Sequence, residues 1–234
     1  MNIVDIIIII FILLFGISGA KRGFFKETVL CLGTILVFVL AYQFKDPLGN
    51  FFLLRFPMFD FPNLFKGVVV LNILVYQLLS FVLILSLLLI IFSIILSVTG
   101  LFEKLLKITV ILGIPSKILG FIVGLVEGYV IAFVLLFFLT QPAFSFNSFM
   151  NSKFANKIVT SSPILTNITQ NTVDVVQDVY KLKDEKNTNM VNSRVLDIML
   201  DKKVINYDTA KTLYDEKKIE FEGIDEVLSK YEDK

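Results

Sequence analysis

The segment Lys21-Arg22-Gly23-Phe24-Phe25-Lys26-Glu27 separates two apolar runs and decides how the chain folds. The run before it, 3–20, is apolar apart from Asp5, Ser18 and the glycines, and the run after it, 28–44, carries no charge. A membrane-spanning helix needs about 20 mainly apolar residues, so each run is long enough to cross a bilayer. Three cations in so short a loop are typical of the cytoplasmic side. The sequence therefore predicts two membrane-spanning helices joined by a cytoplasmic turn.

The overall composition also favours a membrane protein. Hydrophobic residues make up 56% of the 234 positions and charged residues 18%, whereas about 25% of the residues of a soluble domain are charged. The net charge of +1, without a basic stripe, argues against a nucleic-acid partner. Histidine is absent and Cys31 is the single cysteine, which excludes a His/Cys metal site and an intrachain disulfide. No phosphate-binding loop or nucleophile–base pattern occurs, so we expect neither a cofactor nor an enzymatic activity.

Two further apolar runs complete the membrane part of the chain. They are 67–98, which carries no charge, and 118–140, which is interrupted only by Glu127 and is followed by Pro142. We expect an all-α polytopic protein with four transmembrane helices near 3–20, 28–44, 67–98 and 118–140. Lysines in the loop 99–117 favour the cytoplasmic side, and the mixed-charge loop 45–66 is then outside. Alternation places both termini outside the cytoplasm.

Two of the connecting loops are themselves apolar. The loop 45–66 combines three prolines with phenylalanines, which predicts an irregular segment anchored at headgroup depth; a phenylalanine-rich ligand cup is the alternative. These phenylalanines are Phe51, Phe52, Phe56, Phe59, Phe61 and Phe65. The loop 99–117 is amphipathic and is interpreted either as lying on the inner leaflet or as an extension of the third helix.

Small residues recur along the fourth span at every fourth position. They are Ser116, Gly120, Gly124, Gly128 and Ala132, and the first span carries a shorter series, Gly16, Gly19 and Gly23. Helices associate in lipid through such small residues because their backbones can then approach closely. The pattern predicts helix–helix packing at these positions, within one chain or in a homo-oligomer.

Polar side chains in or beside the spans are the candidate functional groups. They are Asp5, Arg22, Glu27, Asn72, Gln77 and Glu127. Glu127 is about ten residues beyond Lys117, roughly 15 Å into the membrane, and no base lies at that depth in another span. A carboxyl there is a functional-site hypothesis, and a structural, hydrogen-bonded carboxyl is the alternative. We expect Glu127 to accept a hydrogen bond from Gln77 or from the polar positions 72 and 76, Glu27 to pair with Lys26 or Arg22, and Asp5 to lie near the outer interface.

The chain after the fourth span is more polar. Residues 143–192 read as an amphipathic helix with a charged linker, and residues 193–234 as a small module of helices at 193–202, 207–217 and 224–230. About 40 residues without a disulfide or a metal form a marginal core. We therefore expect the module to dimerise or to dock on a partner.

Several motifs resemble one known family. Asn2-Ile3-Val4-Asp5 opens the first span, and Gly19-x-x-Arg22-Gly23-Phe24-x-x-Glu27 follows it. Together with Thr99-Gly100-Leu101 and the segment Leu119-Gly120-x-x-x-Gly124-x-x-x-Gly128, these resemble the colicin V production (CvpA-like) family. Ser162-Pro163-Ile164-Leu165 is similar to a segment of its longer, Gram-positive-type members. The chain departs from some relatives at Glu127, where they carry a basic residue.

The resemblance implies a four-helix protein of the bacterial cytoplasmic (inner) membrane, without catalysis, linked to toxin or bacteriocin production or export and to envelope stress tolerance. Its expected partners are the lipid bilayer and either a second copy or other envelope and export proteins. The alternative interpretation is a small transporter or channel subunit that uses the buried Glu127.

Overall fold

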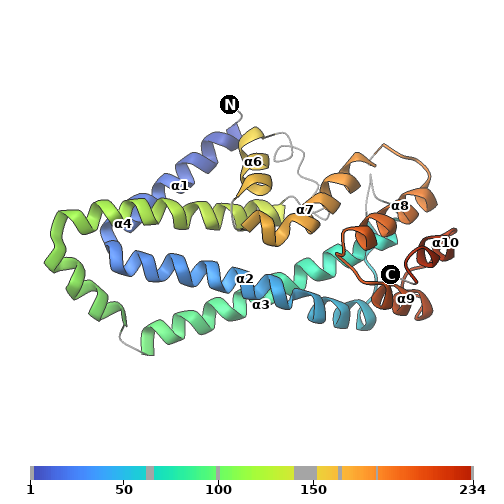
Figure 1. Ribbon diagram of the computed structural model, residues 1–234, viewed down its shortest axis with the longest axis horizontal. Helices are drawn as coiled ribbons and strands as arrows, with labels where there is room; N and C mark the ends of the chain where they lie inside the picture. Colours follow the sequence, from blue (N-terminus) through green and yellow to red (C-terminus); the bar gives the residue numbers. More distant parts are fainter. Residues whose placement is uncertain are drawn as a thin grey trace. The chain divides into compact units, whose positions relative to one another are not determined.

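The structure is a computed structural model that describes residues 3–61, 66–98, 101–139, 152–162, 165–182 and 184–232, with the backbone alone over 101–112. The helices, in chain order, are α1 (Ile3–Arg22), α2 (Phe24–Arg55), the short 3-10 helix η2 (Val69–Leu71), α3 (Asn72–Val98), α4 (Leu101–Leu139), α6 (Lys153–Ser161), α7 (Leu165–Lys181), α8 (Thr188–Asp201), α9 (Tyr207–Asp215) and α10 (Ile224–Ser229). The described residues contain no strand. The all-α prediction is confirmed (Figure 1).

Four helices are long and apolar enough to cross a membrane, as predicted: Ile3–Arg22, Phe24–Arg55, Val69–Val98 and Gly113–Leu139. Much of their aliphatic surface faces outward. Ile7 on α1 and Ile90 on α3 are 60% and 58% exposed, which in water would cost roughly 25 cal/mol for each Å² of apolar surface. In a bilayer the same side chains contact acyl chains at no such cost. The protein is therefore a multi-pass membrane protein.

The described chain divides into two compact units. The first contains α1, α2 up to Gln43, α3 from Val82 onward, α4 and α6. The second contains the remainder of α2, η2, the start of α3 up to Phe81, α7 from Asn167 onward and α8–α10.

Helices α1, α2 and α4 form the centre of the first unit. Helices α1 and α4 run antiparallel and cross in Figure 1, since Gly16 lies against Leu125 while Gly19 lies against Gly120. Aromatic rings join α2 to α4, with the centroids of Phe38 and Phe133 5.8 Å apart. Helix α4 bends at Gly113, whose φ of 57° and ψ of −130° are not helical, and the bend is visible in Figure 1. Glycine adopts this positive φ without the steric cost that a side chain would bring.

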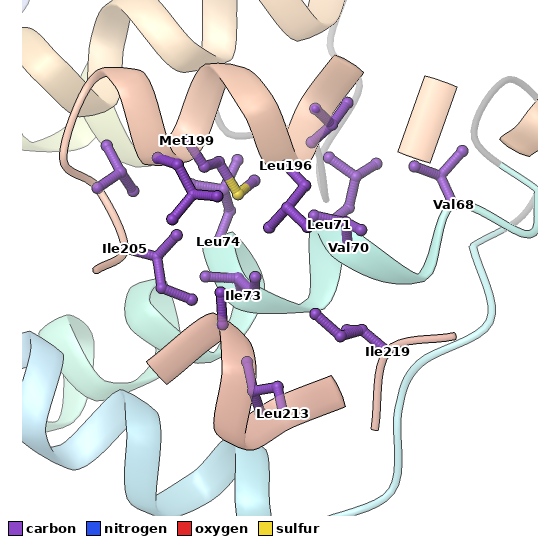
Figure 2. Close-up of a cluster of buried hydrophobic side chains, with 14 of the residues drawn as sticks. Val68, Val70, Leu71, Ile73, Leu74, Leu196, Met199, Ile205, Leu213 and Ile219 are labelled. Atoms are coloured by element: carbon purple, nitrogen blue, oxygen red, sulfur yellow. The ribbon is translucent and has the colours of Figure 1, made fainter. Parts of the chain in front are cut away.

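The core of the second unit is built from aliphatic side chains of separate segments. Leu196 and Met199 of α8 and Leu213 of α9 are fully buried, together with Leu71 and Ile73 from the start of the third span. Figure 2 shows these side chains pointing toward one another. Residues 193–234 thus obtain their core by docking on the chain's own η2 and α3. The small module was expected to need a docking surface, and the chain itself provides one.

Polar contacts hold the same docking surface in register. The Asn192 side chain accepts from Val70 N at 3.2 Å and donates to Gly67 O at 3.1 Å, so it satisfies backbone groups at the start of η2. Gln77 Nε2 donates to Val204 O at 2.9 Å. Buried backbone groups need such partners because an unpaired one carries its full desolvation cost.

Several segment boundaries differ from those predicted. Helix α2 continues through Pro47 to Arg55, so residues 45–55 are helical rather than irregular. A proline inside a helix removes one backbone hydrogen bond without ending this helix, and the Pro47 side chain is exposed. The helix ends two residues before Pro57, where the residue preceding a proline disfavours helix. Gly49 is packed so closely that an added Cβ would lie 3.2 Å from Gln77 Cα.

The phenylalanines of the predicted outer loop divide into two groups. Phe51, Phe56 and Phe59 are each about half exposed, whereas Phe52 and Phe61 pack against the core of the second unit. Phe65 lies outside the described residues, as does Pro142.

Residues 101–112 are helical and continue into the fourth span across the bend at Gly113, so they are not an extension of the third helix. Helix α8 begins at Thr188, where Asn187 caps it. The charged linker predicted to end at residue 192 is therefore shorter than expected.

Candidate functional site

Helices α1 and α4 meet through glycines, with backbone against backbone. A Cβ atom at Gly19 would lie 2.3 Å from Gly120 O, and one at Gly120 would lie 2.4 Å from Gly19 O. One at Gly124 would lie 2.5 Å from Phe15 O. These separations are too short for any side chain, so glycine is required at all three positions. We call this contact the glycine seam; it comprises Gly16, Gly19 and Gly23 together with Gly120, Gly124 and Gly128.

The remaining predicted packing residues, Ser116 and Ala132, continue the four-residue series of α4 at its two ends. Ser116, at the start of the series, accepts a hydrogen bond from Phe24 N at 3.1 Å, so a residue of α4 caps the N-terminus of α2. Gly23, between α1 and α2, has a φ of 78° and lies against Gly120. Ala132 is buried at the other end of the series. The seam therefore also fixes the turn between the first two spans.

Three charged side chains meet beside the seam. The guanidinium of Arg22 lies 3.3 Å from Glu27 Oε2 and 3.4 Å from Glu127 Oε2. The side chain of Glu27 is fully buried and that of Glu127 is 6% exposed, whereas that of Arg22 is 35% exposed. Arg22 ends α1, Glu27 lies in the first turn of α2 and Glu127 lies in α4. We call these three residues the charged cluster.

The direction of helical side chains explains why residues so far apart in depth can meet. Helical side chains lean toward the N-terminus of their helix. Because α1 and α4 are antiparallel, the side chains of Arg22 and Glu127 lean toward one another along the seam. The glycines leave room for the carboxyl of Glu27. A Cβ atom added at Gly19 or Gly124 would lie only 2.8 Å or 3.0 Å from Glu27 Oε1.

The charges of the cluster are unequal, because one guanidinium faces two carboxyl groups. Glu27 Oε1 is buried and has no hydrogen-bond partner in the part of the chain that the structure describes. Cys31, one helical turn further along α2, is buried and lies within electrostatic reach of both carboxyl groups. Over the described residues, no three His, Cys, Asp or Glu side chains are grouped as a metal ion would need. The arrangement can serve as a buried ion-pair network or as a site that takes up a proton.

The expected partners of Glu127 are engaged elsewhere. Gln77 donates to Val204 O, Tyr76 donates to Pro57 O at 2.6 Å, and Asn72 donates to Phe59 O and Val69 O. The structure pairs Glu127 with Arg22 instead, and the hydrogen bond from Gln77 or its neighbours stays a prediction. Among the two expected partners of Glu27, the structure pairs it with Arg22.

Asp5 lies apart from the cluster and has a structural role. It is 6% exposed and accepts hydrogen bonds from Ser152 Oγ at 2.5 Å and Phe154 N at 3.2 Å. Ser152 is the N-cap of α6, so the Asp5 carboxylate binds at the positive end of that helix. This contact docks α6 on the start of α1.

Sequence reasoning missed the link between Arg22 and Glu127 because it assigned depth from Cα positions alone. The reach of an arginine side chain and its direction on the helix were the signals that could have found it. It also missed Lys45, which was expected in the irregular loop at headgroup depth but lies inside α2, is 4% exposed and pairs with Asp46 at 2.5 Å.

The chain matches the model of a known protein family. The family model described as "Colicin V production protein" matches residues 4–163, which include α1–α4 and α6 with the glycine seam and the charged cluster. No curated protein and no solved structure matches the chain.

Proposed function

The chain belongs to the colicin V production family, and we propose that it supports the production or export of a toxin or bacteriocin and the homeostasis of the bacterial envelope. The observation that carries this proposal is the extent of the family match, which covers all four spans and the glycine seam. In this role the protein acts through its place in the membrane and its contacts, without catalysis.

The proposal includes a location and an orientation. Lys21, Arg22 and Lys26 follow the first span within six residues, and such clusters favour the cytoplasmic side. The protein then lies in the cytoplasmic membrane with both termini outside the cytoplasm. Helices α8–α10 would present their surface there to other envelope or export proteins, or to a second copy.

A deletion strain tests the proposed role. We expect deletion to lower the output of a secreted toxin peptide and to raise sensitivity to envelope stress. The wild-type gene should restore both, and Gly124→Leu should not, because it disrupts the seam. Val126→Leu is the matched control, since Val126 lies on the same helix and is 49% exposed. Unchanged secretion and unchanged stress sensitivity in the deletion strain would refute the role.

Cysteine labelling tests the orientation separately. In a Cys31→Ser background, Met190→Cys should react with an impermeant reagent in intact cells, because Met190 is 41% exposed. Lys21→Cys should react only after the membrane is permeabilised. The opposite pattern would invert the topology and leave the family role untouched.

A second candidate function is a small transporter or channel subunit. It is supported by one observation, that Glu27 and Glu127 are both buried beside a single arginine. Transport that uses Glu127 requires its charge to change during a cycle, and Glu127→Gln keeps the shape without the charge. Full function of Glu127→Gln in cells, together with no flux in proteoliposomes, would eliminate this candidate.

A further inference from the structure

The charged cluster contains one more carboxyl group than its arginine can neutralise. Arg22 lies within 3.4 Å of both carboxyl groups, and two ionised carboxylates beside one guanidinium would leave one net negative charge. Burial makes such a charge expensive, since several kcal/mol is the usual cost of an unpaired buried ion. Glu27 adds a second, independent sign of an incomplete site: its Oε1 is fully buried and accepts no hydrogen bond within the described residues.

Among the described side chains, Arg22 is the cation that the structure pairs with the two carboxyl groups. Helix α4 contributes Glu127, and its Lys117 is exposed, one turn beyond the exposed bend at Gly113. Helix α2 contributes Glu27, the half-buried Lys26 beside it and the thiol of Cys31. Helix α1 contributes Arg22, while Lys21 is exposed. The part of α3 in this unit, 82–98, carries no ionisable side chain.

We propose that the charged cluster is a proton-binding site, in which Glu27 and Glu127 together hold one proton beside Arg22. The proton cancels the excess charge and gives the pair an O–H donor, which a carboxyl oxygen lacks when both groups are ionised. Because the two groups interact, the proton belongs to the pair rather than to either residue. The inference sharpens the second candidate function, but it concerns the resting protein and does not depend on transport.

The geometry favours a proton over a metal cation. Among the residues that the structure describes, no three His, Cys, Asp or Glu side chains are grouped as a metal ion would need. The guanidinium of Arg22 beside both carboxyl groups would also repel a bound cation. A proton needs no additional volume.

Infrared spectroscopy of the full chain in lipid nanodiscs tests the proposal. We expect the carbonyl stretching band of a protonated carboxylic acid at neutral pH, shifted in deuterated buffer and lost at alkaline pH. Glu127→Gln and Glu27→Gln should each abolish this pH-dependent band completely, because the remaining carboxylate and Arg22 form a neutral pair. Arg22→Gln should double it, because both carboxyl groups then hold a proton.

The control is Glu226→Gln, the same change at an exposed position of α10, which should leave the band unchanged. The proposal is overturned if wild-type protein shows no such band at neutral pH, or if the band survives in both glutamine variants. The wild-type pH titration needs no variant, so the proposal stays testable even if a substitution prevents folding. Failure of this test would leave the proposed envelope role unaffected, since that role rests on the deletion strain.

Discussion

The glycine seam and the core of the second unit solve the same packing problem with opposite residues. At the seam, Gly19 and Gly120 bring two backbones so close that a methyl group on either would lie within 2.4 Å of an oxygen atom. In the second unit, Leu196, Met199 and Leu213 fill the space between helices and are fully buried. The first region excludes side chains, and the second consists of them.

The difference follows from the solvent of each region, which is lipid for the helices of the seam and water for the α8–α10 module. Between helices in lipid there is no hydrophobic driving force, so close van der Waals contact between backbones supplies the attraction. The α8–α10 module is polar on its outer face, and its buried aliphatic side chains gain about 25 cal/mol for each Å² removed from water. The seam should therefore fail when atoms are added, and the core of the second unit should fail when atoms are removed.

Adding atoms to the seam should have the largest effect. Gly124→Leu would drive a side chain into Phe15 O and the backbone of Gly16, at a cost of about 3 kcal/mol or more, above the usual range for overpacking, because backbone cannot move aside. Thermal unfolding and the yield of monodisperse protein in detergent measure it. Val126→Leu should change stability by less than about 0.5 kcal/mol, as lipid-facing changes do. Equal stability of the two variants would show that the seam is not close-packed.

Removing atoms from the second unit should have the next largest effect. Leu196→Ala leaves a cavity in a fully buried position and should cost about 2–5 kcal/mol. Hydrogen exchange should increase in α8–α10, with peptides of α1 and α4 unchanged. Met190→Ala, at a 41% exposed position of the same helix, is the control. Faster exchange in α1 and α4 as well would mean that the two units unfold together.

High pH should loosen the second unit selectively through Tyr231. Burial and a hydrogen bond to Asp197 raise the pKa of the Tyr231 hydroxyl to about 12, above its usual value of about 10. The folded state thus favours the neutral hydroxyl, so this contribution is complete below about pH 10 and is lost as the pH rises toward 12.

Tyr231→Phe isolates that contribution. The variant loses the hydrogen bonds to Asp197 O and Oδ1, both 3.1 Å long, and should be about 1 kcal/mol less stable at neutral pH. Unfolding of the second unit is followed by hydrogen exchange in peptides of α8–α10. The difference in stability between wild type and variant should narrow above pH 10. A gap that stays constant with pH would remove Tyr231 as the cause.

The smallest expected effect is a stabilisation at a helix end. Lys203, which follows α8, has a φ of 54° and an exposed side chain, and left-handed backbone costs an ordinary residue roughly 1 kcal/mol. Lys203→Gly removes that cost but gives the unfolded chain more freedom, so we expect a net gain of about 0.5 kcal/mol. Calorimetry measures it. Lys217, with the same φ after α9, offers an independent repeat, and destabilisation at both sites would refute the explanation.

The sequence alone determined the class of the protein and its long helices. Apolar runs of membrane length form helices in lipid, because a helix satisfies every backbone group within the segment. The family match and the four apolar helices confirm the family and the membrane class. Recurrence every four residues also placed Gly120, Gly124 and Gly128 on one helix face before any partner was known.

Only the tertiary structure decided which residues meet. The pairing of Arg22 with Glu27 and Glu127 depends on the antiparallel crossing of α1 and α4 and on the lean of long side chains, neither of which a linear pattern contains. The same holds for Asp5 at the start of α6, and for the docking of α8 and α9 on η2 and α3. A periodic pattern reports which face of a helix is small, apolar or charged, whereas the identity of the opposite face is a long-range property of the folded chain.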